Sequence, residues 1–504
     1  MRGVLISLIL IAIGMSGCNG GRNDTPLVPL PTPPISKAYP LDINFTSLPS
    51  GPITGTVNVS GVDVSGQGAV VDQGTIELNP GELFLAPPGD VSEVAVMIKA
   101  QSQSSVITGL DQNNMPVSTN FTWKLGDYYF FTISTGSADI HQVQVSGPDS
   151  AVQRVIFSNP NSFIDFEAVG VISMANSASD MLVADLDGDG KTDIAVVSPA
   201  DSLIHVAYGD GAGGFARDET IHAAGTPGKI AAADIDGDTL PDLMLTVPDS
   251  GLAQVFKNEG GAFDSGVTYS VGASPAAIAI ADISGNAPDI AVAGADGVGI
   301  LPNNGDGTFG SLQPVPGLNG PALDLALADV DLDRKTDLIV ALPSSIQVWI
   351  GDGAGGFTAP GSSLTIPITQ TVKKLAALTL DWDKYPDIVA IFTSSPNFSS
   401  WLYDKSGTFI DSQTFDAVSG AAADLALADI NSDGFADMVV ADGTSGKLSL
   451  YIGLLMGQFQ PVKNIGDGPS PVIIRAGDLD KDRRNDIMTL DSSGNLRIYL
   501  NRSY

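Results

Sequence analysis

Residues 185–193 read DLDGDGKTD, and residues 234–242 read DIDGDTLPD. The same acidic pattern begins five more times, at Asp282, Asp329, Asp381, Asp429 and Asp478. Successive starts lie 49, 48, 47, 52, 48 and 49 residues apart. A fixed period of this length is typical of a repeat architecture in which each copy forms one structural unit.

Each repeat carries the same order of predicted strands around its acidic loop. A short strand rich in Ala and Leu leads into the loop, as at residues 325–328, and a more apolar strand leaves it, as at 338–341. A third strand follows, as at 347–350, and then a Gly-rich hairpin and a weaker fourth strand. Four short antiparallel strands per repeat, with small residues on the first, predict a propeller blade. The fold class is therefore all-β, with a seven-bladed β-propeller.

The last repeat ends after its third strand, so another segment must complete the seventh blade. Residues 163–172 (FIDFEAVGVI) precede the first loop and are expected to supply that strand. Pairing the two ends of the ring in this way removes exposed sheet edges. In an alternative arrangement, residues 163–169 belong to the preceding domain and only 169–174 close the ring.

The acidic loops have the composition of a cation site. Side chains at positions 1, 3, 5 and 9 surround one centre, and the carbonyl of position 7 adds a further oxygen. A flexible, all-oxygen shell favours Ca²⁺ over Mg²⁺, while one Cys and three His in the whole chain disfavour Zn²⁺. Position 12 lies in an apolar strand, as at Val196 and Leu245, so the loop is not the helix-flanked EF-hand, which needs Glu there. The Gly-rich hairpins also hold acids (Asp210, Asp306, Asp352), which are predicted to form turns.

The loops, their spacing and the GDGxxF-type hairpins resemble the FG-GAP repeat family in its bacterial VCBS-like form, which includes the propeller of integrin α subunits. The resemblance covers about residues 165–504. It implies about five Ca²⁺ ions, and ligands at the positions of the five complete loops: Asp185, Asp187, Asp189, Asp193, Asp234, Asp236, Asp238, Asp242, Asp329, Asp331, Asp333, Asp337, Asp429, Asn431, Asp433, Asp437, Asp478, Asp480, Asp482 and Asp486. The loops at Asp282 (DISGNAPD) and Asp381 (DWDKYPD) are shorter and are expected to have lost the ion.

The first 36 residues predict export and anchoring. Arg2 and an apolar run from Val4 to Met15 read as a signal peptide over residues 1–17. Ser16-Gly17-Cys18 resembles a bacterial lipobox, which implies lipidation of Cys18; an ordinary secretory signal with an incidental cysteine is the alternative. By the same resemblance, Asn19 favours an outer-membrane or surface destination. Residues 18–36 form a Pro-rich tether.

Residues 37–160 are predicted to form a β-sandwich or jelly roll, followed by the propeller at 161–504. Alternating runs such as 53–59, 94–98 and 128–133 are typical of short strands. An aromatic cluster at 121–131 is either a ligand platform or core packing. The same two interpretations apply to Phe398 and Trp401 in the segment 391–401, which is predicted to be the longest loop away from the calcium face.

The charge distribution restricts the function. The chain has a net charge of −33, which argues against nucleic-acid binding, and 24 of its 57 acidic residues lie in the seven loops. We expect a non-enzymatic adhesion or protein/glycan-binding module of the cell envelope, with membrane contact only through the lipid. The alternatives are a secreted enzyme that cleaves polysaccharides or phosphoesters, and a structural part of an envelope assembly. No catalytic constellation emerges from the three scattered His residues, so no catalytic residue is predicted.

Overall fold

The structure is a computed structural model of the chain. It describes strand positions between residues 41 and 158, and residues 166–503 with gaps at 382–383, 404–406, 417–419, 432–433, 455–456 and 468–469. Segments Asp165–Ile430 and Phe435–Ser503 belong to one compact unit. Signal peptide, Cys18 and tether lie outside the described residues.

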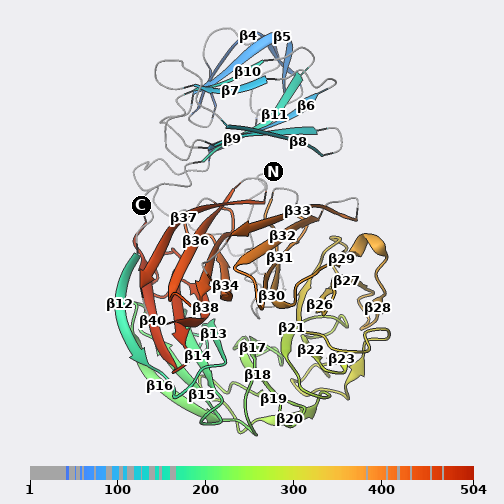
Figure 1. Ribbon diagram of the computed structural model, residues 1–504, viewed down its shortest axis with the longest axis vertical. Helices are drawn as coiled ribbons and strands as arrows, with labels where there is room; N and C mark the ends of the chain where they lie inside the picture. The colour runs from blue at the N-terminus through green and yellow to red at the C-terminus, as the bar shows by residue number, and fades with distance from the viewer. Residues whose placement is uncertain are drawn as a thin grey trace. The chain divides into compact units, whose positions relative to one another are not determined.

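Residues 166–503 form seven antiparallel sheets arranged as blades around an axis (Figure 1). Six sheets have four strands, and the fourth blade has a fifth strand. In blades 1–6 the strands run from the axis outwards in sequence order, and each acidic loop joins the first strand to the second. The predicted seven-bladed propeller is confirmed.

The strands of blades 1 to 3 are β13 (Asp180–Ala184), β14 (Asp193–Ser198), β15 (Leu203–Gly209) and β16 (Phe215–His222); β17 (Ile230–Ala233), β18 (Asp242–Val247), β19 (Leu252–Phe256) and β20 (Val267–Ser270); and β21 (Ala277–Ala281), β22 (Asp289–Gly294), β23 (Gly297–Leu301) and β24 (Gln313–Pro314). Blade 4 contains β25 (Asp324–Ala328), β26 (Asp337–Leu342), β27 (Ser345–Gly351), β28 (Phe357–Thr358) and β29 (Thr365–Pro367). A 3-10 turn, η2 (Ser362–Leu364), precedes β29.

The strands of blades 5 and 6 are β30 (Val372–Leu378), β31 (Asp387–Phe392), β32 (Asn397–Tyr403) and β33 (Phe409–Asp416); and β34 (Ala422–Ala428), β35 (Asp437–Asp442), β36 (Lys447–Leu454) and β37 (Gln458–Asp467). Blade 7 contains β38 (Pro471–Gly477), β39 (Asp486–Asp491), β40 (Asn495–Asn501) and β12 (Phe166–Ser173).

The two ends of the propeller close the ring within blade 7. β12 pairs antiparallel with β40 along its whole length, from Phe166 opposite Asn501 to Ser173 opposite Asn495. Figure 1 shows this green strand beside the red C-terminal strands. Because pairing begins at Phe166, the segment before the first loop belongs to the ring, and the arrangement that left only 169–174 for closure is wrong.

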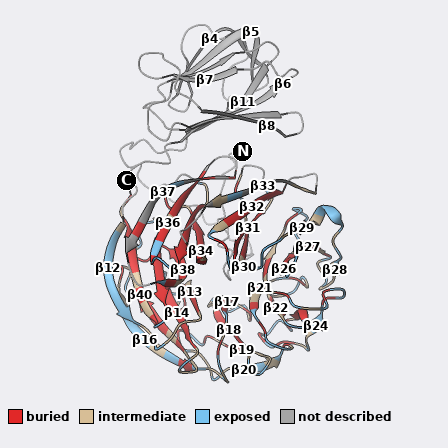
Figure 2. Ribbon diagram, viewed as in Figure 1, coloured by how far each residue is buried: buried red, intermediate tan, exposed pale blue. Residues whose placement is uncertain are grey.

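The burial of each strand follows from its place in the blade. Every residue of β14, β18 and β39 is buried, because both faces of a blade's second strand are covered by neighbouring blades (Figure 2). Ile230-Ala231-Ala232-Ala233 in β17 is also buried, and such small side chains suit the crowded axis. The outermost strands β12 and β16 are mostly exposed.

The hydrophobic core lies between blades rather than within them. One cluster joins Leu182 and Val197 of blade 1 to Ile230 and Leu243 of blade 2, all at most 5% exposed. Another joins Met181 of blade 1 to Leu490 of blade 7 across the ring closure. Each blade therefore depends on its neighbours for burial, as expected for a repeat architecture.

Residues 41–158 contribute one antiparallel network of eleven strands. The strands are β1 (Leu41–Asn44), β2 (Gly51–Pro52), β3 (Val57–Val59), β4 (Val62–Asp72), β5 (Thr75–Ala86), β6 (Glu93–Ala100), β7 (Val106–Leu110), β8 (Thr119–Leu125), β9 (Tyr128–Ser134), β10 (Gln142–Ser146) and β11 (Ser150–Ser158). Its main path runs β2-β4-β5-β11-β6-β9-β8. The β-rich character agrees with the sequence; the sandwich arrangement and the role of the aromatic cluster stay predictions.

Among the described residues, the helical content is limited to a short turn, and none of it could cross a bilayer. The predicted loop at 391–401 is wrong in extent, since β31 ends at Phe392 and β32 begins at Asn397. Phe398 is fully buried and stacks on Phe415 with centroids 4.6 Å apart, while Trp401 is 8% exposed. Both side chains therefore pack within the propeller and do not form a platform for a sugar.

Candidate metal centre

The complete loops at Asp185, Asp234, Asp329 and Asp478 reverse the chain through left-handed backbone at positions 4 and 6. In blade 1 these positions are Gly188 and Gly190, with φ of 74° and 75°. In blade 7 they are Lys481 and Arg483, at 62° and 71°. A non-Gly residue there costs on the order of 1 kcal/mol or more, so other contacts must stabilise the turn.

The aspartate at position 1 supplies such contacts. Oδ2 of Asp185 accepts the N–H of Gly190 at 2.9 Å, and Oδ2 of Asp478 accepts that of Arg483 at 2.9 Å. The loops at Asp234 and Asp329 repeat this bond at 2.9 and 2.8 Å. The first carboxylate therefore caps the strained turn and fixes its own orientation.

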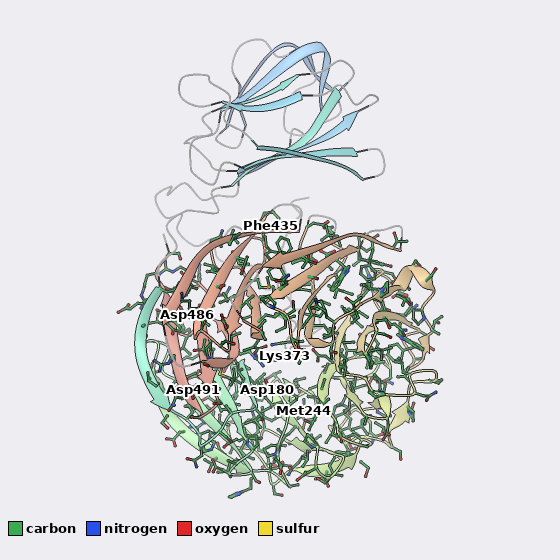
Figure 3. The ribbon with its side chains drawn as sticks, viewed as in Figure 1. Asp180, Met244, Lys373, Phe435, Asp486 and Asp491 are labelled. Carbon is green, nitrogen blue, oxygen red and sulfur yellow. The ribbon has the colours of Figure 1, made fainter. Side chains whose placement is uncertain are left out.

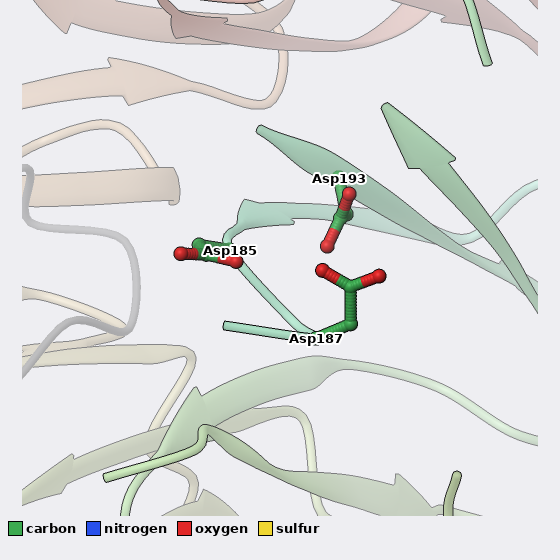
Figure 4. A group of neighbouring side chains, drawn as sticks. All are labelled: Asp185, Asp187 and Asp193. Carbon is green, nitrogen blue, oxygen red and sulfur yellow. The ribbon is translucent and has the colours of Figure 1, made fainter. Parts of the chain in front are cut away.

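Four loops bring three carboxylates together. Their ligand atoms lie within 4.8 Å of one another in four groups: Asp185, Asp187 and Asp193; Asp234, Asp236 and Asp242; Asp329, Asp331 and Asp333; and Asp478, Asp480 and Asp486. Figure 4 shows the first group, whose three carboxyl groups converge at the end of β13. Like charges so close repel one another unless a cation or protons lie among them.

Unpaired oxygens support a cation at three of the four clusters, whereas Asp480 of the fourth pairs with Arg502. Oδ1 of Asp185, Oδ1 of Asp236 and Oδ1 of Asp329 are buried and have no hydrogen-bond partner. Burying a carboxylate oxygen without a donor is costly, and a bound cation would supply the missing partner. The donor set is entirely oxygen, which fits a hard cation such as Ca²⁺.

The aspartate at position 9 has a second role that is the same in every blade. It is the first residue of the second strand, and its carboxylate accepts the N–H of loop position 2, six or seven residues earlier, and an N–H near the end of the third strand, at 2.7–3.0 Å. These seven residues, all at most 1% exposed, are Asp193, Asp242, Asp289, Asp337, Asp387, Asp437 and Asp486. We call them the closing aspartates.

In blade 5 the loop N–H accepted by the closing aspartate is that of Leu380, and Leu378 pairs with Asp387, so this loop spans nine residues, 379–387, with Thr379 at position 1. The expectation that the loop at Asp381 is shortened is therefore wrong.

Burial changes the acidity of several closing aspartates. Desolvation raises the pKa of Asp193, Asp242, Asp337 and Asp486 to about 6, although the two backbone N–H groups favour the charged form. The neighbouring loop carboxylates raise these pKa values further. Protonation and a bound cation are thus alternative ways to neutralise the same buried charge.

The acid at position 5 lies apart from the centre in three of the four clusters. Asp189 pairs with Lys191, and Asp482 pairs with Arg484 at position 7. Asp333 also pairs with its position-7 residue, Lys335, at 2.6 Å, yet it still belongs to its cluster. The sequence placed all four acids around one centre, whereas in three loops the structure gathers positions 1, 3 and 9.

Two further loops were considered in the sequence, one at Asp429 with the complete pattern and one at Asp282 with a shortened pattern. In the loop at Asp429, Asp433 lies outside the described residues. Asp437 there keeps both backbone bonds, at 2.7 and 2.8 Å. The shortened loop at Asp282 contributes to none of the carboxylate clusters found among the described residues. Instead, Ser284 Oγ donates to Asp289 Oδ1 at 3.2 Å.

The hairpin acids form turns, as predicted. Oδ1 of Asp210 accepts the N–H groups of Ala212 and Gly214 at 2.7 and 3.0 Å. Asp352 repeats the pattern with Ala354 and Gly356 at 2.8 and 2.9 Å. With both N–H groups on one oxygen, these carboxylates act as local turn formers.

Sequence reasoning missed a group of ionisable residues at the axis. Asp180, Asp424 and Arg475 lie on innermost strands and are at most 7% exposed. Figure 3 places Asp180 near the middle of the ring. A signal was present, because Asp180, Asp324 and Asp424 each stand five residues before a loop start in strands that are otherwise small and apolar.

Comparison with known proteins agrees with this architecture. The FG-GAP-like repeat family matches residues 185–245, 380–440 and 429–489. None of the curated proteins matches in sequence. Each matched segment begins at or just before one acidic loop and ends in the second strand of the next blade.

Similar solved structures include BBS1N in complex with ARL6DN. The structure from its lead-soaked crystal shares 13% sequence identity with this chain at a TM-score of 0.49, and the match covers 66% of this chain and 96% of that one. The mercury-soaked crystal has 13% identity and a TM-score of 0.48, with 67% and 97% covered. A lectin from Agrocybe aegerita that recognises non-reducing terminal N-acetylglucosamine is 16% identical, with a TM-score of 0.44, over 81% of this chain and 98% of that one.

The family match and the blade count carry the assignment together. The matched repeats lie in blades 1–2, 5–6 and 6–7, and the same loop-and-strand unit recurs in the remaining blades. The ring formed by residues 166–503 is therefore an FG-GAP-repeat β-propeller.

Proposed function

We propose that this chain is a non-enzymatic binding module of a bacterial cell envelope whose propeller is stabilised by Ca²⁺. The observation that carries the calcium part is the set of convergent carboxylates with buried oxygens that lack a donor. The binding part is supported by the scaffold, because an FG-GAP propeller is compatible with a binding module.

The loop carboxylates would hold the ion at the junction of two strands. In blade 1, Asp185 follows the end of β13 and Asp193 begins β14, so one shared cation ties both strands together. A bound Ca²⁺ would offset two of the three negative charges of the cluster. Extracellular calcium sites often bind at about 10⁻⁴–10⁻³ M, so the loops are expected to fill outside the cell.

Binding is tested with a full-length Cys18→Ser protein, which removes the predicted lipid without altering the propeller. A glycan array and a pull-down from envelope extract are run with Ca²⁺ and with EGTA. We expect capture that depends on calcium, because the loops order the blades. Release of a cleaved product from an array glycan would instead favour the enzymatic alternative.

The anchoring part rests on the lipobox-like sequence before Cys18. We expect the wild-type protein to fractionate with membranes and to label with a radioactive fatty acid. Cys18→Ser should abolish both. If the variant remained with the membranes, anchoring through Cys18 would be wrong, while the propeller's calcium dependence would be unaffected.

A further inference from the structure

The acidic loops of neighbouring blades are joined directly by side-chain hydrogen bonds. Thr192, at position 8 of the loop in blade 1, donates through Oγ1 to the carbonyl of Asp478, position 1 of the loop in blade 7, at 2.6 Å. Thr336 makes the same bond from blade 4 to the carbonyl of Asp282 in blade 3, at 2.7 Å. Each bond therefore starts at the residue before a closing aspartate and ends on the first residue of the adjacent loop.

An asparagine after the third strand forms a second kind of link. The backbone N–H of Asn258 in blade 2 donates to Oδ1 of Asp242 at 2.8 Å, and its side-chain Nδ2 donates to the carbonyl of Leu186 at 2.6 Å. Leu186 is position 2 of the loop in blade 1, and its own N–H donates to Asp193 Oδ2 at 2.7 Å. A path of three hydrogen bonds therefore connects the closing aspartates of blades 2 and 1.

These links place three carboxylate clusters in one connected series. Thr192 joins the loops of blades 1 and 7, Asn258 joins blade 2 to the loop of blade 1, and all three loops contribute a cluster. The cluster of blade 4 differs, because Thr336 links it to the loop of blade 3, which contributes to none of the clusters among the described residues. On its other side, position 8 of the loop in blade 5 is Pro386, which has no donor.

A hydrogen bond between two loops makes the order of one depend on the order of the other. Without a cation, the carboxylates of a cluster repel one another, which loosens the loop that carries them. The bonded carbonyl of Asp478 belongs to a residue of one cluster, and Thr192 is adjacent to Asp193 of the other. Fixing either loop therefore lowers the entropic cost of fixing its neighbour, which is a coupling between the two sites.

We propose that the loops of blades 7, 1 and 2 bind their cations cooperatively, with Thr192 and Asn258 as the positioning residues that connect one loop to the next. The loop of blade 4 binds independently of them. The inference rests on the calcium binding proposed above and adds to it how the sites depend on one another. Because the series spans the junction between the last repeat and the first, binding at these loops also holds the two ends of the repeat array together.

The size of the coupling is limited by the hydrogen bond at each junction. The net contribution of one such bond corresponds to a factor of about five in an equilibrium constant. Filling the loop of blade 1 should therefore raise the affinity of the loop of blade 7 by up to about five-fold. At saturating Ca²⁺ every loop still fills, so the coupling changes the shape of the titration and not the number of ions bound.

The experiment follows hydrogen exchange of the segment 478–486 by mass spectrometry in the full-length Cys18→Ser protein, as Ca²⁺ is raised at pH 7 and constant ionic strength. Protection of this segment reports the state of the blade 7 loop, in which Asp478 Oδ2 accepts the N–H of Arg483. Asp185→Asn removes a carboxylate from the cluster of blade 1. It should raise the Ca²⁺ concentration at half-protection of 478–486 by about three- to five-fold.

Variants of the bridging threonine test whether the hydrogen bond carries this shift. Thr192→Val removes the hydroxyl and nearly keeps the shape of the side chain, so in this background Asp185→Asn should not move the midpoint for 478–486 further. Thr192→Ser retains the hydroxyl and should retain the shift. Thr336→Val is the matched control, because it removes the equivalent hydroxyl between blades 4 and 3, and the shift should persist in it. Melting curves in Ca²⁺ verify that every variant is folded.

The loop of blade 4 supplies the independent site. Asp282→Asn changes position 1 of its neighbouring loop and should leave the midpoint for the segment 329–337 unchanged. An unshifted midpoint for 478–486 in Asp185→Asn would overturn the proposal, as would a shift that persists in Thr192→Val, since it would then arise from charge and not from the hydrogen bond. Neither result would affect the proposed calcium binding. Absence of any Ca²⁺-dependent protection in the parent would refute that binding and the coupling with it.

Discussion

The loop of blade 1, at residues 185–193, and the loop of blade 3, at 282–289, end in the same buried aspartate but differ in what surrounds it. In blade 1, Asp193 shares a centre with Asp185 and Asp187. In blade 3, Asp289 faces the hydroxyl of Ser284, and the loop is one residue shorter. Yet both closing aspartates accept the same two backbone N–H groups.

This comparison separates two roles that the acidic motif combines. The closing aspartate joins the loop to the third strand in all seven blades, including blade 3, whose loop is one residue short, and blade 5, whose loop has Thr379 at position 1. The alternating acids before it are complete only in some blades and form the carboxylate clusters. A blade can therefore lack the carboxylate cluster and keep its shape.

The largest expected effect is that of calcium itself. At about 10 mM Ca²⁺ and a dissociation constant of 10⁻⁴–10⁻³ M, each site contributes about 1.4–2.7 kcal/mol, so several sites raise the free energy of unfolding strongly. Thermal unfolding in Ca²⁺ and in EGTA measures the gain. Asp185→Asn should reduce this calcium-dependent gain in unfolding free energy by the contribution of one site. The matched change Asp282→Asn should leave the gain unchanged. An equal loss in both variants would remove the distinction between the loops.

Replacing a closing aspartate should destabilise both kinds of blade. Asp193→Ala and Asp289→Ala each leave two buried backbone N–H groups unpaired, at about 1–3 kcal/mol per group. Denaturant unfolding in EGTA should therefore show losses of about 2–6 kcal/mol for both. In Ca²⁺ the loss should grow for Asp193→Ala only. A calcium gain that also falls in Asp289→Ala would mean that the shortened loop binds an ion.

The pH dependence in EGTA should reflect the closing aspartates of the complete loops. The pKa of Asp193 is raised from 3.8 to about 6 in the folded protein, so its contribution to stability is present below pH 3.8 and is lost as the pH rises through 6. Stability in EGTA should therefore increase as the pH falls from 7 to 5. Asp193→Asn should show a shallower increase than the parent; an unchanged slope would contradict the assigned pKa. In Ca²⁺ the dependence should weaken or reverse, because protons compete with the ion.

The smallest expected effect tests whether one acid restores a lost site. Ser284→Asp places a second carboxylate beside Asp289 but leaves the loop one residue short. We expect no additional bound calcium and a loss of about 1 kcal/mol in EGTA, because a hydrogen bond is replaced by repulsion. Chemical unfolding with and without Ca²⁺ measures both. A gain of stability in Ca²⁺ would show that acid content, not loop length, decides binding.

The repeats predicted the propeller because their information is local and periodic. Loop spacing, strand order and the turn acids Asp210 and Asp352 could all be read within one repeat. Ring closure by residues 163–172 also followed, since a blade without a fourth strand needs a partner. These features depend on short-range patterns that recur seven times.

Contacts between distant segments could not be predicted in the same way. Arg475 pairs with Asp180, which lies 295 residues away in the sequence. No pattern in the sequence of either strand indicates the other residue as its partner. Phe398 was open to two interpretations because an aromatic residue looks alike in a loop and in a strand, and its burial became clear only with β32 in place. The double role of the closing aspartate was hidden because both roles require the same side chain.

The most direct test of the account is the number of calcium ions bound per chain, measured by equilibrium dialysis at saturating Ca²⁺. We expect five ions, one for each loop with the complete acidic pattern, falling to four in Asp185→Asn and remaining five in Asp282→Asn. Seven ions per chain would contradict this, because the loops of blades 3 and 5 would then bind as well. A chain that binds none would remove the metal centre altogether.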